Sequence, residues 1–352
     1  MTDRNKPGLD DGTFVRRVLI ALGLTLLAYI FWELRTLLLM LFGAVVVATI
    51  FRALADQFQK RIGIRENLAV AAAIVVIVGA ALLLMVVFGQ NVARQAALLD
   101  ETLPVAWRSF EARMAELGLG DELKRIVASI RESLSPAGYG RAVIGLGNAV
   151  AQMLVVLFAG IFLAAQPRFY ATGALELFPE ARRPLIGMAM AESEKALRLW
   201  LKGQVIAMVA VGTLTGLGLW LLGVPSALIL GMIAGLLEFV PYLGPILAAV
   251  PGVLLALAMS PDLAIWVAML YFAVQQFEGY VLTPLVQQYA VDLPGVLLLF
   301  SLLGFGILFG TLGVVLAAPL TVVTYVLVKR LYVIETLHTP TPIPGERGKR
   351  PR

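Results

Sequence analysis

The segment PSALILGMIAGLLEFVPYLGPILAAVPG, residues 225–252, consists of two apolar stretches on either side of the string EFVPYLGP. The arms of this unit are Ser226–Val240 and Ile246–Met259, the second of which continues past the quoted string. Each is about 15 residues long, whereas a helix needs about 20 apolar residues to cross a bilayer. Pro ends a helix and Gly tolerates a positive φ, so a string rich in both favours a turn. We therefore predict a re-entrant helical hairpin, which enters and leaves the membrane on one side.

A second broken unit lies nearer the carboxy terminus. It comprises Pro294–Phe309 and Leu312–Val328, with Gly310 between them. A shift of 69 residues aligns this unit with the first and gives 9 identities in 27 positions, with Gly244 opposite Gly313. Several identities are expected by chance in a chain so rich in Leu and Ala, but we interpret the match as an internal repeat.

The rest of the chain is also apolar. Of its 352 residues, 60% are hydrophobic and 14% are charged, whereas a soluble domain is about half apolar and about a quarter charged. We expect an all-α polytopic membrane protein with about eight membrane segments, two of them the broken hairpins. The other six are predicted at Val18–Phe31, Thr36–Phe51, Leu68–Gly89, Val143–Ala165, Gln204–Leu222 and Leu263–Leu282.

The positions of Lys and Arg predict the orientation, because these residues are retained on the cytoplasmic side. If the amino terminus, which is rich in Lys and Arg, is inside, three further segments rich in these residues also fall inside. They are Arg52–Arg65, Gln166–Lys202 and the Lys329–Arg330 pair. Both termini are then cytoplasmic, and the two broken units are inverted, as in secondary transporters that bind substrate between broken helices. The predicted parts are a cytoplasmic tail (1–17), three spans (18–90), an extracytoplasmic amphipathic helical segment (91–141), a fourth span (142–165), a cytoplasmic amphipathic segment (166–202), a transport core of two inverted units (203–333) and a Pro-rich basic cytoplasmic tail (334–352).

Two acidic residues within the apolar core are the leading candidates for function, because ionisable groups are costly there. Glu238 directly precedes FVPYLGP, and Glu278 lies in QQFEGYVLTP beside Gln275 and Gln276. In one interpretation each Glu only binds backbone donors exposed by a helix break. In the other, one or both contact a substrate, a proton or sodium. Tyr242 can likewise donate to a polar ligand or anchor the tip.

The other candidate residues shape the backbone. We predict that they form hairpin tips and hinges, since they are all Pro or Gly. They are Pro241, Gly244, Pro245, Gly279, Pro284, Gly310 and Gly313.

Several function classes are disfavoured by composition. Cys is absent and His338 is the only His, so we expect no metal site, no cofactor and no thiol chemistry. There is no GxxxxGK[ST] loop for ATP, and no Ser and His pair or paired aspartates in the spans for a protease, so we expect no enzyme. The net charge of +5 is explained by positive residues beside the spans rather than by nucleic-acid binding.

The broken units also carry a resemblance. Three stretches of the chain resemble the carboxy-terminal half of the autoinducer-2 exporter (AI-2E) family of bacterial membrane transporters. They are the 225–252 segment, QQFEGYVLTPLVQQ and LPGVLLLFSLLGFGILFGTLGVVLAAPL. The resemblance covers about Arg16 to Tyr332. The matching motif positions are Glu238, Pro241, Tyr242, Gly244, Pro245, Gln276, Glu278, Gly279 and Pro284.

The resemblance implies a multi-pass protein of the bacterial cytoplasmic (inner) membrane, surrounded by lipid and assembled as a homo-oligomer, a pentamer, with an elevator-like moving part. Some members export the quorum-sensing furanone autoinducer-2, and some relatives are sodium or lithium/proton antiporters. Our first hypothesis is therefore a secondary transporter that exports a small polar organic solute such as autoinducer-2. The alternatives are a sodium or lithium/proton antiporter and a non-transporting membrane scaffold.

Overall fold

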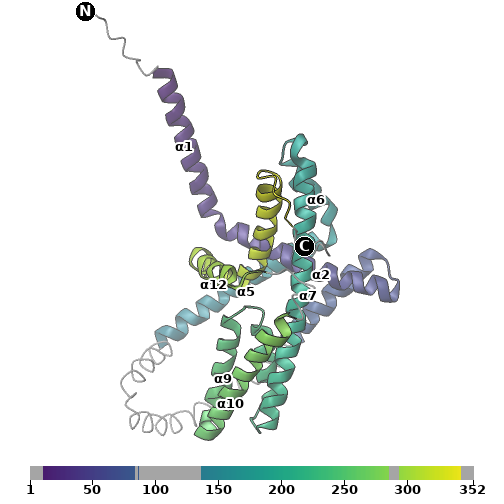
Figure 1. Cartoon of the computed structure of the whole chain (residues 1–352), viewed down its shortest axis with the longest axis vertical. Coiled ribbons are helices and arrows are strands. Elements are labelled where there is room, and N and C mark those ends of the chain that lie inside the picture. Colours follow the sequence, from purple (N-terminus) through teal and green to yellow (C-terminus); the bar gives the residue numbers. More distant parts are fainter. Residues whose placement is uncertain (1–10, 84–85, 87–135, 285–292, 342–352) are drawn as a thin grey trace, which may run out of the picture.

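The computed structural model describes residues 11–83, 86, 136–284 and 293–341, and these residues form helices and turns without a strand. Figure 1 shows the arrangement, with α1 standing apart from the other helices. Most of the predicted 91–141 segment, residues 91–135, lies outside the described residues, as do residues 285–292. The helices are α1 (Asp11–Glu33), α2 (Arg35–Ile62), a helix at Glu66–Leu83, α5 (Pro136–Ala165), α6 (Pro167–Glu176), α7 (Arg183–Leu221), α8 (Ala227–Leu237), α9 (Leu243–Met259), α10 (Pro261–Phe277) and α12 (Gly295–Leu327).

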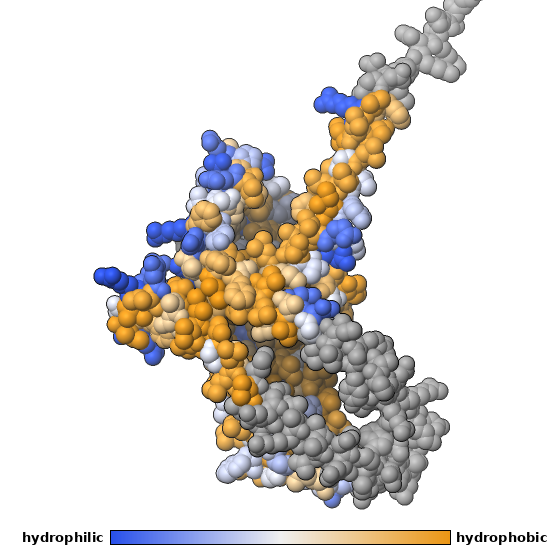
Figure 2. Space-filling model, turned by 180° about the vertical axis from the view of Figure 1, so that it is seen from behind, coloured by the Kyte–Doolittle hydropathy of each residue, from blue (hydrophilic) through white to orange (hydrophobic). Residues whose placement is uncertain are grey.

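Among the described residues, six helices are long and apolar enough to cross a membrane, and α8 and the apolar part of α9 are shorter. The six are Phe14–Glu33, Arg35–Ile62, Glu66–Leu83, Gly147–Ala165, Glu180–Leu221 and Gly295–Ile334. Large apolar side chains cover much of the surface, as the orange areas of Figure 2 show. The prediction of an all-α polytopic membrane protein is thereby confirmed, while the count of eight segments stays a prediction.

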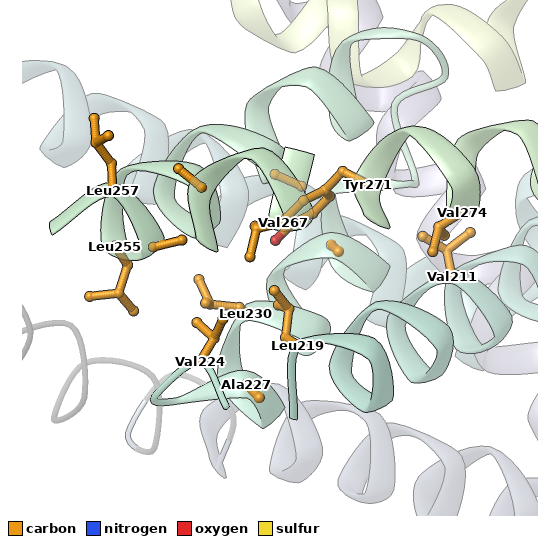
Figure 3. Close-up of a cluster of buried hydrophobic side chains, with 14 residues drawn as sticks. Val211, Leu219, Val224, Ala227, Leu230, Leu255, Leu257, Val267, Tyr271 and Val274 are labelled. Atoms are coloured by element: carbon orange, nitrogen blue, oxygen red, sulfur yellow. The ribbon is translucent and has the colours of Figure 1, made fainter. Parts of the chain in front are cut away.

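Three clusters of buried side chains hold the described helices together. The first joins the second half of α7 to α8, α9 and α10, where Leu219, Leu230 and Val267 meet (Figure 3). The second joins α2, the first half of α7 and α12. The third joins α2, the Glu66–Leu83 helix and α5. We call the helices of the first cluster the first packed body and those of the second cluster the second packed body. Since α7 belongs to both clusters, it connects the two packed bodies.

Helices α7 and α8 approach closely along a stripe of glycines. A Cβ added at Gly231 would lie 2.6 Å from the Gly212 carbonyl oxygen, and one at Gly235 would lie 2.6 Å from that of Met208. Small residues allow such close contact, which stabilises helix pairs in membranes by van der Waals packing. We refer to α8, the following break and α9 as hairpin one, and to the two parts of α12 on either side of Gly310 as hairpin two. The glycines of α8 therefore fix the first arm of hairpin one against α7.

The chain turns back at both predicted breaks. Between α8 and α9, Tyr242 adopts φ 66, and within α12 Gly310 adopts φ 66 and ψ −148. A Cβ at Gly244 would overlap the Leu237 carbonyl oxygen, and one at Gly313 would overlap that of Phe305. Eight residues of straight helix span about 12 Å, so the Gly313 contact requires a fold-back.

The glycines paired by the 69-residue offset thus occupy matching places, each packed on the arm that precedes its break. Side chains next to the two breaks pack against the same group of buried residues, the cluster that joins α2, α7 and α12. They are Phe239 at the break between α8 and α9, and Phe309 and Leu312 at the break within α12. This agrees with the interpretation of an internal repeat. The re-entrant character of the two hairpins stays a prediction.

Candidate functional site

A cavity of about 370 Å³ lies between the two packed bodies. It is bordered by α7, by the break between α8 and α9, by the end of α10 and by the start of α12. Its aromatic and polar lining residues are Trp200, Gln204, Glu238, Tyr242, Gln275, Glu278 and Thr283. Trp200 of α7 and Leu298 of α12 are far apart in the sequence but line the same polar cavity, and we take this cavity as the candidate site.

Glu238 follows the last residue of α8 and is only 4% exposed. Its main-chain carbonyl oxygen accepts a hydrogen bond from Gln204 Nε2 on α7 at 2.6 Å. Its carboxyl oxygen Oε2 is buried and has no hydrogen-bond partner among the described residues. A buried polar atom without a partner is costly, which makes Glu238 a candidate for contact with a ligand in the cavity that it lines.

Glu278 lies where α10 passes into a short π-helical segment, η2 (Glu278–Leu282). Its Oε2 accepts a hydrogen bond from Gln275 Nε2 at 3.0 Å, and its Oε1 accepts one from the Thr283 hydroxyl at 2.8 Å. Single π-helical turns occur frequently at functional sites. Here the widened turn lets Thr283, five residues further on, reach the carboxylate, so both oxygens of Glu278 are held in place.

Aromatic residues border the polar part of the cavity. The ring of Trp200 packs edge-to-face against Phe239, with 5.9 Å between the ring centroids. The hydroxyl of Tyr242 approaches the start of α12, where a Cβ added at Gly295 would lie 3.1 Å from it. The break of hairpin one thus lies against the first residues of α12, where Gly295, which has no side chain, leaves room for Tyr242.

The structure brings together four of the five predicted contact residues: Glu238, Glu278, Gln275 and Tyr242 all line the cavity. Gln276 does not line it and is exposed. Among the predicted tip and hinge residues, Pro241 and Gly279 line the cavity, Gly244 and Pro245 form the first turn of α9, Pro284 ends the described run after η2, and Gly310 and Gly313 lie at the second break.

Three of the aromatic and polar lining residues, Trp200, Gln204 and Thr283, are absent from the sequence-based set of candidates. Trp200 lies in a segment that the charge pattern assigns to the cytoplasm, and Thr283 is placed by a π-helical turn that helical periodicity does not predict. Gln204 is recognisable in the sequence as an amide at the edge of an apolar span. Its hydrogen-bond partner is a main-chain oxygen, which every residue has, so the sequence does not predict this contact.

The charge of the cavity limits what it can hold. Among the described residues that line it, the ionisable side chains are Glu238, Glu278 and Tyr242, and none is Lys, Arg or His. Such a lining favours a cation, a proton or a neutral solute with hydroxyl groups over an anion. Within the described residues no group of three or more His, Asp or Glu is placed to hold a metal ion.

A larger groove of about 720 Å³ is lined by residues between Val205 and Trp220 of α7 and between Leu228 and Leu236 of α8. Its lining is almost wholly apolar, with Thr213 as a polar exception. In a membrane helix such a surface is suited to lipid or another apolar neighbour rather than to a polar solute. The smaller cavity is therefore the better candidate for transport chemistry.

Comparison with known proteins gives a consistent result. A family model described as AI-2E family transporter matches residues 19–332. The chain is 30% identical over 162 residues to YrrI of Bacillus subtilis (strain 168), named as a candidate transport protein, covering 46% of each chain. It is 28% identical over 218 residues to YueF of the same organism, named likewise, covering 62% of this chain and 56% of that protein.

A third relative is the AI-2 transport protein TqsA of Escherichia coli (strain K12). The chain is 28% identical to it over 124 residues, which covers 34% of this chain and 36% of TqsA. The matches thus span about half of the length of YrrI and YueF and about a third of that of TqsA.

Proposed function

The chain belongs to the AI-2E transporter family, and on this premise we propose that it is a secondary transporter that exports a small polar organic solute such as autoinducer-2. A role in membrane transport follows from the family and its named relatives. The name of TqsA supports the choice of solute. The observation that carries the proposal is the polar cavity between two packed bodies of membrane helices.

The size and lining of the cavity support a small neutral solute. A volume of about 370 Å³ is at the lower end of the range of about 300–1,000 Å³ for small-molecule sites. The carboxylates of Glu238 and Glu278 can accept hydrogen bonds from hydroxyl groups, and the amide of Gln275 can donate or accept. Trp200 and Tyr242 offer ring surfaces to the apolar part of the solute.

The proposed movement is elevator-like. The cavity is lined by Glu238 and Tyr242 from the break after α8, by Glu278 from the end of α10, and by Leu293 and Leu298, which pack in the second cluster. A displacement of one body relative to the other therefore changes which side the cavity faces. Since α7 belongs to both bodies, its middle turns would bend or slide during this change.

A sodium or lithium/proton antiporter is the second candidate function, and Glu238 is the residue that favours it. Its buried carboxyl oxygen lacks a partner among the described residues, and a proton or a small cation would neutralise the group and supply the missing interaction. The same residue can couple solute export to a proton gradient. The two candidates thus use one site.

Assembly and location complete the proposal. The family and the apolar surface place the chain in a membrane, and we assign it to the bacterial inner membrane with both termini in the cytoplasm. We expect a homo-oligomer, a pentamer. Exposed apolar residues of α1 such as Leu19, Leu22 and Leu26 then contact lipid or a second copy.

The test is a flux screen with purified protein in liposomes. Export of autoinducer-2, neutral sugars, sodium and lithium is measured with and without imposed proton and sodium gradients. We expect saturable flux of autoinducer-2 or a neutral polyhydroxylated solute, reduced by Glu278→Gln. Cation flux without solute flux would favour the antiporter, and protein that transports neither would contradict both.

A further inference from the structure

Helix α6 has an apolar face that no other part of the described structure covers. Phe169 is 70% exposed and Leu177, which directly follows the helix, is 84% exposed. Tyr170 and Phe178 are also exposed, and the rings of Phe169 and Tyr170 stack edge-to-face. At about 100° per residue, Phe169, Tyr170 and Leu177 lie on one side of α6.

The other two sides of α6 have different environments. Leu175 faces α7, within 3.8 Å of a Cβ added at Gly187. Arg168, Thr172 and Glu176 are exposed polar residues on the remaining side. The helix therefore has a protein-facing side, a polar side and an uncovered apolar side, which is the pattern of a helix that lies in a membrane surface.

The position of α6 in the chain indicates what covers the apolar side. The membrane-spanning helix α5 ends at Ala165, and α6 begins at Pro167 after a single intervening residue. The outer surface of α5 is itself apolar up to this end, with Phe158 58% and Phe162 61% exposed. One extended residue spans about 3.5 Å, so α6 cannot leave the vicinity of the membrane surface.

We propose that α6, together with Leu177 and Phe178, lies in the lipid–water interface and inserts its apolar side among the lipid chains. Arg183, the first residue of α7, donates from Nε to the Phe178 carbonyl oxygen at 3.1 Å. This hydrogen bond joins the end of the interfacial segment to the start of α7. The anchored segment would hold the first turns of α7 at the membrane surface while the rest of α7, including Gln204, takes part in transport.

The test uses nitroxide labels on single Cys residues in the full-length Cys-free chain, reconstituted in phosphatidylcholine vesicles. Leu177→Cys reports on the apolar side, and Thr172→Cys, about 140° away around the helix, is the matched control. Accessibility to oxygen, which partitions into lipid, is compared with accessibility to a water-soluble nickel chelate. We expect position 177 to favour oxygen and position 172 to favour the chelate.

Two results would overturn the proposal. Equal access of the nickel chelate to both positions would place α6 in water. Spin–spin broadening at position 177, together with low access to both reagents, would show that a second copy of the chain covers this side instead of lipid. Neither result depends on whether the protein transports a solute.

Discussion

Gln204 donates a hydrogen bond from Nε2 to the main-chain carbonyl oxygen of Glu238 at a distance of 2.6 Å. The last carbonyl groups of a helix lack partners within the helix, and in a membrane they must find partners in the protein. A side chain of α7 thus satisfies the end of α8 and fixes the backbone of a residue that lines the cavity.

The second break has a comparable contact. Arg35, at the start of α2, donates from Nε to the Leu308 carbonyl oxygen at 3.3 Å, two residues before Gly310. Its guanidinium group also lies over the Trp32 ring and donates from Nη1 to the Trp32 carbonyl oxygen at 2.7 Å. Each hairpin therefore has its first arm held by a side chain from another helix.

Replacement of Gln204 by Leu tests the first of these contacts. The change leaves the Glu238 carbonyl group without its donor, which we expect to cost about 1–3 kcal/mol locally and to reduce transport several-fold. Hydrogen exchange of residues 236–243 should become faster. Gln276→Leu is the matched control, because Gln276 is an exposed amide outside the cavity. Unchanged exchange and transport in Gln204→Leu would contradict the role.

Replacement of Glu278 by Gln removes a titratable charge but keeps the shape of the side chain. We expect the variant to fold and assemble, with transport strongly reduced or with its pH dependence lost, since an amide does not titrate in this range. Flux in liposomes over a range of pH is the measurement. Wild-type transport at every pH would refute the role of Glu278.

The glycines at the breaks should not tolerate a side chain. A Cβ at Gly244 would overlap the Leu237 carbonyl oxygen, whereas nothing lies within 4 Å of a Cβ at Gly279. We expect Gly244→Ala to destabilise the protein by about 1–3 kcal/mol and Gly279→Ala to have a much smaller effect on stability. Thermal unfolding in detergent compares the two, and equal midpoints would show that the close contact at Gly244 is not required.

The proposed orientation can be tested by labelling. A single Cys at position 115 should react with an impermeant thiol reagent added to intact cells, whereas one at position 190 should react only after permeabilisation. The expectation rests on the placement of Lys and Arg. Reaction at 190 but not at 115 would invert the topology.

Much of the fold follows from local sequence. Pro241 and Gly244 interrupt an apolar run, and the structure turns at that point. Gly310 interrupts another, and its positive φ is a conformation that glycine adopts readily. Both glutamates that the sequence marks as costly in a membrane line the same cavity.

The finer arrangement of the site depends on contacts that local patterns do not encode. Gln275 and Gln276 are equivalent by composition, but only Gln275, three residues before Glu278, reaches the carboxylate. Thr283 reaches it because the helix widens at η2. Leu293 and Gly295 join the cavity through packing between distant segments, which requires knowledge of the tertiary structure.

The central claim is that the solute occupies the cavity between Glu238 and Glu278. Solute protection of a single Cys tests it most directly. Ala207→Cys places a thiol in this cavity, and Thr213→Cys places one in the apolar groove on the same helix. In transport-competent liposomes, a transported solute should slow thiol labelling at 207 in proportion to site occupancy and leave labelling at 213 unchanged. Equal labelling of 207 with and without a solute that is being transported would contradict the claim.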